Sequence, residues 1–160
     1  MTVVASSKDT EALTMTFVAE FDTGIERVWQ LWEDPRQLER WWGPPGWPAT
    51  FLRHELVPGG ESRYYMTGPA GERPDGYWRV LTVDAPHEFT FEDGFTGADG
   101  EPVDEPPVHG VVTLESSSAG TRMTVVSTFA SPEQLEQLLA MGMDEGMRQA
   151  LGQMDALLAA

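Results

Sequence analysis

The chain has no cysteine and only one lysine, Lys8, among its 160 residues. The absence of cysteine excludes disulfides, thiolate catalysis and cysteine-ligated zinc. No apolar run approaches the roughly 20 residues that span a bilayer. The opening stretch, MTVVASSKDTEALT, lacks the apolar core of a signal peptide. We therefore expect a cytoplasmic location.

Basic residues are few. The chain has 10 lysines and arginines against 26 acidic residues, which gives a net charge of −16. Nucleic-acid affinity rests on lysine and arginine neutralising phosphates, so we expect no nucleic-acid partner. An anionic membrane surface is disfavoured for the same reason, and we expect no membrane partner. The acidity is interpreted as a contribution to solubility, with attraction to a basic partner as the alternative.

Familiar catalytic and metal-binding motifs are also missing. The three histidines, His54, His87 and His109, are isolated and show no metal-ligand spacing. There is no nucleophile elbow, P-loop or dinucleotide-binding glycine motif. We therefore assign no catalytic residue, no metal and no cofactor, and favour a non-catalytic role while leaving the question of an activity open.

Alternation of apolar and polar residues dominates the chain. Residues 13–22 alternate, with Met15, Phe17, Ala19 and Phe21 on one face, and predict a half-buried strand. Helical spacing follows around Ile25–Trp32 and a second short helix is predicted from Pro35. Six more strands are predicted between residues 49 and 130, joined by short connections, and one long amphipathic helix over residues 132–159.

This order, one strand, two short helices, six strands and a long helix, predicts an α+β fold. Its seven-stranded antiparallel sheet curls around the long C-terminal helix. Residues 12–160 are expected to form a single domain, preceded by a loose segment over residues 1–11. A strongly bent sheet around one helix leaves space between them, so an internal cavity is expected.

Three stretches resemble a known family: VWQLWEDPRQLERWWGPPGWP (28–48), LVPGGESRYYM (56–66) and EGMRQALGQMDALLA (145–159). They are similar to the activator of heat-shock protein 90 ATPase homologue-like (AHSA-type) branch of the START/Bet v 1-like (SRPBCC) helix-grip superfamily. The resemblance covers about residues 13–159. It implies a helix-grip fold. It leaves function open, because the branch includes both co-chaperone domains and many bacterial proteins, and the wider superfamily includes lipid binders and polyketide cyclases.

Candidate ligand-binding residues come from the apolar side chains expected near the cavity. The segment ERWWGPPGWP (39–48) concentrates tryptophan where proline and glycine break regular structure, and it is placed at the cavity mouth. Gly142 and Gly146 are poor helix formers and are expected to face the cavity or a close strand. The predicted ligand-binding set is Trp42, His54, Tyr65, Trp78, Met143 and Met147.

Two positions in this set stay open at the level of sequence. If Leu52 and Leu56 face the core, alternation along the strand turns His54 toward the cavity. If the core-facing residues are instead Phe51, Arg53 and Val57, His54 faces solvent. Of the adjacent residues Tyr64 and Tyr65, only one can point into the concave face of the sheet.

The leading hypothesis is a non-catalytic protein that holds a small hydrophobic ligand in its cavity. The alternative is a protein-interaction domain, such as a chaperone ATPase activator or co-chaperone. A polyketide cyclase- or hydrolase-like enzyme is the third. We expect a monomer or a homodimer.

Overall fold

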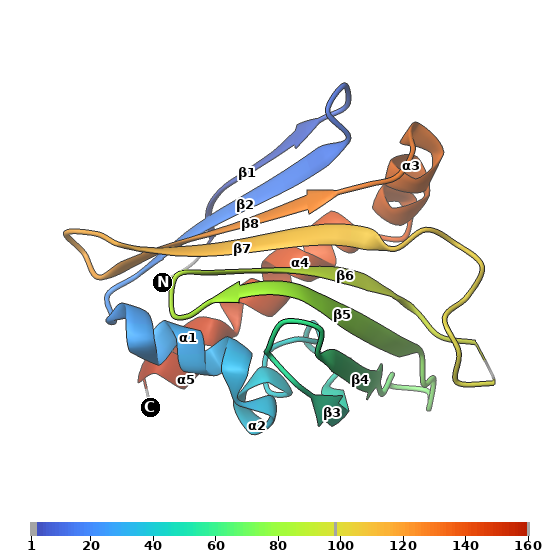
Figure 1. The fold of residues 1–160 in the computed structure, drawn as a ribbon, viewed down its shortest axis with the longest axis horizontal. Coiled ribbons are helices and arrows are strands. Elements are labelled where there is room, and N and C mark those ends of the chain that lie inside the picture. Colours follow the sequence, from blue (N-terminus) through green and yellow to red (C-terminus); the bar gives the residue numbers. More distant parts are fainter. Residues whose placement is uncertain (1–2, 98, 160) are drawn as a thin grey trace.

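The computed structural model describes residues 3–97 and 99–159 and contains one antiparallel sheet of eight strands. The strands lie side by side in the order β1-β2-β8-β7-β6-β5-β4-β3, so β3 to β8 form a meander that returns to β2 (Figure 1). Their bounds are β1 Val3–Asp9, β2 Thr14–Phe21, β3 Ala49–His54, β4 Glu61–Met66, β5 Asp75–Asp84, β6 Glu88–Phe95, β7 Val108–Ser116 and β8 Thr121–Thr128.

The prediction of seven strands is wrong by one, because the segment expected to be loose contributes β1. This strand pairs antiparallel with β2 along the edge of the sheet. Its residues Ala5 to Asp9 are all exposed, so no apolar alternation marks them in the sequence. Residues 1 and 2 of that segment lie outside the described residues.

Two short helices follow β2 as predicted: α1 (Ile25–Glu33) and α2 (Pro35–Leu38). The apolar stripe of α1 buries Val28, Leu31 and Trp32 completely. Asp34 ends α1 and caps α2, since its carboxylate accepts a hydrogen bond from the Arg36 backbone N–H at 2.9 Å.

The closing segment is not the one long helix that was predicted. It consists of α3 (Pro132–Ala140), α4 (Met143–Gly152) and α5 (Met154–Ala159). The main break lies at Gly142, whose φ of 83° is left-handed and therefore favours glycine. Figure 1 shows α4 running behind the sheet, with α5 beside α1 at one end and α3 at the other.

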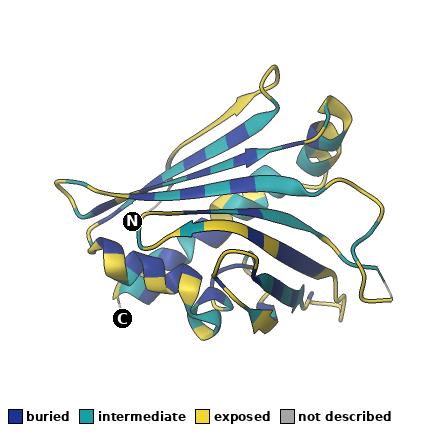
Figure 2. Cartoon of the chain, in the orientation of Figure 1, coloured by how far each residue is buried: buried dark blue, intermediate teal, exposed yellow. Residues whose placement is uncertain are grey.

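One face of the sheet forms the core, as the alternation predicted. Residues of β2 alternate between partly buried and buried along its length, and Figure 2 shows the same banding on β7 and β8. The largest fully buried side chains are Trp32, Trp41 and Trp78. The curved antiparallel sheet with helices on one face has the helix-grip arrangement.

None of the helices within the described residues combines the length and the apolar character that crossing a membrane requires.

Candidate functional site

An apolar cleft of about 450 Å³ lies between the sheet and the closing helices. Its wall is built from α1, from the loop after α2, from strands β4, β6, β7 and β8, and from α3 and α4. The lining residues are Trp32, Trp42, Pro44, Trp47, Tyr64, Met66, Pro74, Phe91, Asp93, Gly94, Phe95, Val108, Gly110, Val125, Ser127, Leu138, Met141, Gly142, Met143, Gly146, Met147 and Ala150.

Three of the six predicted ligand-binding residues lie on this wall: Trp42, Met143 and Met147. Gly142 and Gly146 also line the cleft, so their expected orientation is correct. The reasons differ between the two glycines. Gly142 is required by its backbone conformation, whereas Gly146 leaves open space, because a Cβ there would meet no atom within 4 Å.

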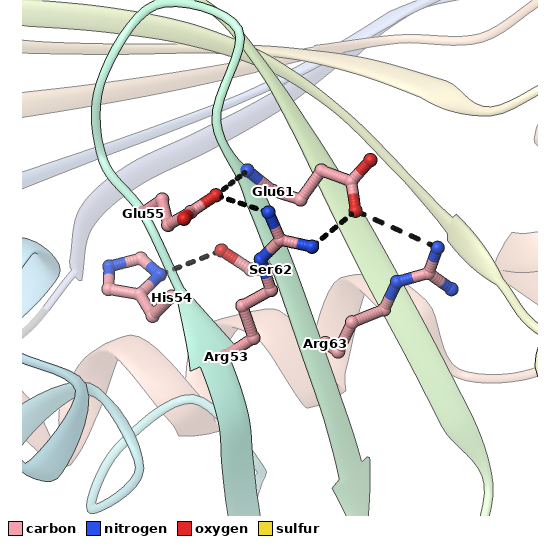
Figure 3. Close-up of polar contacts among 6 residues, drawn as sticks. All are labelled: Arg53, His54, Glu55, Glu61, Ser62 and Arg63. Carbon is pink, nitrogen blue, oxygen red and sulfur yellow. Dashed lines mark hydrogen bonds and ion pairs between the residues drawn. The ribbon is translucent and has the colours of Figure 1, made fainter.

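His54 does not line the cleft. Its ring lies between two polar partners, with Nδ1 2.7 Å from the Ser62 hydroxyl oxygen and Nε2 2.7 Å from the Trp32 carbonyl oxygen. Burial lowers the pKa of His54, partly opposed by the Trp32 carbonyl. Figure 3 shows the ring turned toward Ser62, away from the exposed side chain of Arg53. The histidine ties α1 to strands β3 and β4.

A β-bulge explains the orientation of His54. The register of β3 against β4 shifts between Phe51 and Arg53, so strict alternation fails along this strand. Phe51 points inward and Leu52 is 70% exposed, yet His54 still turns toward the core. Neither alternative derived from simple alternation describes the strand.

Tyr65 and Trp78 are the other two predicted residues outside the cleft. Tyr65 points away from the core, and the Arg73 guanidinium lies 3.7 Å from its ring centre. Its neighbour Tyr64 is the inward-facing member of the pair. Trp78 is fully buried behind the wall, with its ring centre 4.9 Å from that of Trp42 and 4.6 Å from that of Phe91.

The tryptophan-rich segment 39–48 combines an anchor with part of the cleft wall. Trp41 is fully buried, and its indole N–H donates a 2.8 Å hydrogen bond to the Leu31 carbonyl. Trp42 and Trp47 both line the cleft. Gln153, between α4 and α5, donates to the Gly43 carbonyl at 2.6 Å and thereby ties this loop to the closing helices.

Asp93 supplies an acidic group to a largely apolar wall. The Tyr64 hydroxyl donates a hydrogen bond to Asp93 Oδ1 over 3.1 Å. Asp93 also borders a second hollow of about 270 Å³, and this hollow shares Gly94, Phe95, Val108, Leu138 and Met141 with the cleft. The two hollows are therefore contiguous along β6.

The surroundings of Asp93 favour its neutral form. Burial raises the pKa of Asp93 to about 7, and the Tyr64 hydrogen bond only partly opposes this rise. The Tyr64 hydroxyl in turn has its pKa raised well above the usual value by its burial and by the charge of Asp93. The carboxyl group of Asp93 can therefore gain or lose a proton near neutral pH.

The sequence contains a signal for Asp93 that a search for apolar side chains passes over. In HEFTFEDGF (87–95), the period of two places Asp93 on the same side of the strand as Phe89 and Phe91. Both phenylalanines are buried. An acidic residue in register with a buried apolar face is expensive unless it has a partner, which makes it a candidate functional residue.

A second polar group on the wall is the indole N–H of Trp42. It is buried, and it has no hydrogen-bond partner within the described part of the chain. This N–H lowers the pKa of the Tyr64 hydroxyl, against the larger effects of burial and Asp93 that raise it. This donor therefore lies inside the wall and not on the surface that the cleft exposes.

Cationic side chains and clustered metal ligands are missing from the described part of the site. The wall of the cleft contains no histidine, lysine or arginine among the described residues. Over the same residues, no group of three or more histidine, cysteine or acidic side chains could hold a metal ion.

The fold and cleft define a helix-grip protein of the START/Bet v 1-like class. Residues 22–159 match the family model described as "Activator of Hsp90 ATPase homolog 1-like protein", and the chain belongs to this family. The resemblance stated from the sequence motifs is thereby confirmed. No curated protein matches the chain.

Two solved bacterial structures are similar over nearly the whole chain. A protein from Arthrobacter aurescens, solved in solution by NMR, is 54% identical, with a TM-score of 0.95 over 99% of this chain and 92% of that one. Protein Ms6760 from Mycobacterium smegmatis is 48% identical, with a TM-score of 0.90 over 98% of this chain and 96% of that one.

A more distant likeness links the fold to DynU16, a protein in the dynemicin biosynthetic locus. It is 19% identical, with a TM-score of 0.61 over 86% of this chain and 46% of that one. At this identity the likeness shows the fold alone.

Proposed function

We propose that the protein binds a small, largely apolar molecule in the cleft between its sheet and α4. The observation that carries the proposal is the cleft itself. Its volume of about 450 Å³ lies within the range of roughly 300–1,000 Å³ typical of small-molecule sites. Its wall has the composition of such sites, aromatic and aliphatic with few polar groups.

The proposed contacts fall into two kinds. Trp42, Met143 and Met147 provide apolar surface, and methionine adapts to ligands of irregular shape. Asp93 and Tyr64 provide the polar contacts that orient a ligand. His54, Tyr65 and Trp78 have no direct contact in this proposal, because they lie outside the cleft.

A glycine-to-leucine substitution tests the proposal. Gly146→Leu places a side chain into open space on the wall, so the fold should tolerate it while the cleft is filled. We expect the Kd for the neutral fluorescent probe N-phenyl-1-naphthylamine to rise at least tenfold. The rise in probe fluorescence on binding, measured by titration, gives the Kd.

Gly152→Leu is the matched control. Gly152 is in the same helix, and a Cβ there would also meet no atom within 4 Å, yet it does not line the cleft. The Kd of this variant should stay within twofold of that of the unchanged chain. Equal effects of the two substitutions, or no probe binding by the unchanged chain, would refute cleft binding.

The second candidate is a protein-interaction role on a chaperone. The family description names activation of the Hsp90 ATPase, and Leu52 and Val57 on and beside the edge strand β3 are 70% and 54% exposed. In this case the chain should raise the ATPase rate of a purified Hsp90-type chaperone, and Leu52→Asp should reduce the effect. An unchanged ATPase rate would rule this candidate out.

The cyclase hypothesis has only the shared fold in its favour.

A further inference from the structure

The carboxyl group of Asp93 has no cationic partner within the described residues of the protein. Tyr64 donates to Oδ1, and no residue of the described chain pairs with Oδ2. Neither the cleft nor the adjoining hollow is lined by lysine, arginine or histidine over the same part of the chain. Asp93 is partly buried and borders both hollows. A partly buried carboxylate without a counter-charge is unfavourable, and a ligand that carries a positive charge would reduce this cost.

The cleft wall around this carboxyl is aromatic. Trp32, Trp42, Trp47, Tyr64 and Phe91 all line the cleft. The face of an aromatic ring attracts cations, most strongly in tryptophan, and aromatic surfaces combined with a carboxylate are well suited to an ammonium group. The apolar body of such a ligand would find further surface on Met143 and Met147.

The charge of the whole chain acts in the same direction. With a net charge of −16, the protein attracts cations and repels anions such as carboxylates and sulfonates. A hydrogen bond between an ammonium and a carboxylate is also roughly twice as strong as one between neutral groups. Of the neutral, anionic and cationic ligand classes, the cationic class fits best.

We propose that the ligand of this cleft is an apolar amine whose ammonium group pairs with Asp93 and whose body lies against the aromatic and methionine wall. This inference rests on the proposed function, since it specifies the ligand class for the same cleft. It makes Asp93 the residue that selects the ligand by charge.

Three probes with one naphthalene body separate charge from apolar contact: 2-naphthylmethylamine, 2-naphthalenemethanol and 2-naphthoate. Isothermal titration calorimetry at pH 8 should show the amine binding at least tenfold more tightly than the alcohol, and the naphthoate binding most weakly. Asp93→Asn keeps the size of the side chain and removes the charge. It should weaken amine binding at least tenfold and change alcohol binding by no more than about twofold.

Asp75→Asn is the control for net charge, because Asp75 is an exposed acidic residue on the neighbouring strand β5. It should leave the binding of all three probes unchanged.

Lowering the pH to 5 should weaken amine binding to the unchanged chain but not to Asp93→Asn. The groups facing Asp93 are Tyr64 on β4, Trp78 on β5 and Val108 on β7, with the acidic Glu105 in the adjoining hollow. Because Asp93→Asn leaves Glu105 unchanged, loss of the pH dependence in this variant assigns it to Asp93.

The outcomes distinguish the inference from the proposed function. Equal binding of amine and alcohol, or amine binding that Asp93→Asn leaves intact, would overturn the role of Asp93 while leaving cleft binding in place. Tighter binding of the naphthoate would do the same. Failure of all three probes to bind the unchanged chain would overturn both proposals.

Discussion

Replacing Trp41 with alanine is expected to lower the free energy of unfolding by about 3–5 kcal/mol. Trp41 is fully buried, and its ring centre lies 4.6 Å from that of Trp32. The substitution leaves a large void and removes the indole donor from the Leu31 carbonyl. Urea denaturation followed by circular dichroism measures the loss.

Trp47→Ala is the matched control for Trp41→Ala, since it removes the same side chain from the same loop. Trp47 is only partly buried and lines the cleft. Its loss should cost less than about 1 kcal/mol. Similar losses for both variants would contradict the division of this loop into a buried anchor and a part of the cleft wall.

Asp93→Asn should stabilise the protein progressively as the pH rises. The pKa of Asp93 is about 7 in the folded chain, against 3.8 for an unperturbed aspartate, so the folded state holds its proton more tightly than the unfolded state. The native carboxyl therefore costs stability as the pH rises from about 4 to 7, and the full cost is present above pH 7. Asparagine does not titrate and avoids this cost.

The advantage of Asp93→Asn over the unchanged chain should grow by about 3 kcal/mol between pH 5 and pH 8. Urea denaturation at both pH values measures the two differences. Asp75→Asn, at an exposed position, should show no such growth. A pH-independent difference for Asp93→Asn would mean that the folded environment does not raise the pKa of this carboxyl.

Much of the fold follows from local patterns in the sequence. The alternation in β2, β4, β6, β7 and β8 comes from one buried face of the sheet, so it can be read directly from residues such as Met15, Phe17 and Phe21. The capping of α3 is also readable, because the Ser131 hydroxyl accepts from the Gln134 backbone N–H at 3.1 Å.

The features that sequence reasoning missed depend on tertiary contacts. Strand β1 is held by backbone pairing to β2, and its exposed residues Ser6, Ser7 and Lys8 carry no burial pattern. Glycines in the closing segment can be recognised from the sequence as poor helix formers. Helix propensity alone does not reveal that Gly142 has a positive φ and divides the segment into separate helices.

Part of the cleft wall can be predicted from the sequence. Trp42, Met143 and Met147 were identified because large apolar residues were expected near a cavity beneath the closing helices. The bulge in β3 disrupted the alternation on which the position of His54 depended. Asp93 does not stand out by residue type because acidic residues are abundant in this chain, although its register with Phe89 and Phe91 sets it apart.

The methionine methyl groups allow the central claim, binding in the cleft, to be tested most directly. Met66, Met141, Met143 and Met147 line the cleft, whereas Met15, Met123 and Met154 are buried elsewhere in the core. In a chain labelled with ¹³C at the methionine methyls, 2-naphthalenemethanol should shift the cleft signals and give intermolecular nuclear Overhauser effects to Met143 and Met147. The signals of the three core methionines should stay in place. Unchanged cleft signals at saturating probe, or Overhauser effects to the core methionines instead, would contradict ligand binding between the sheet and α4.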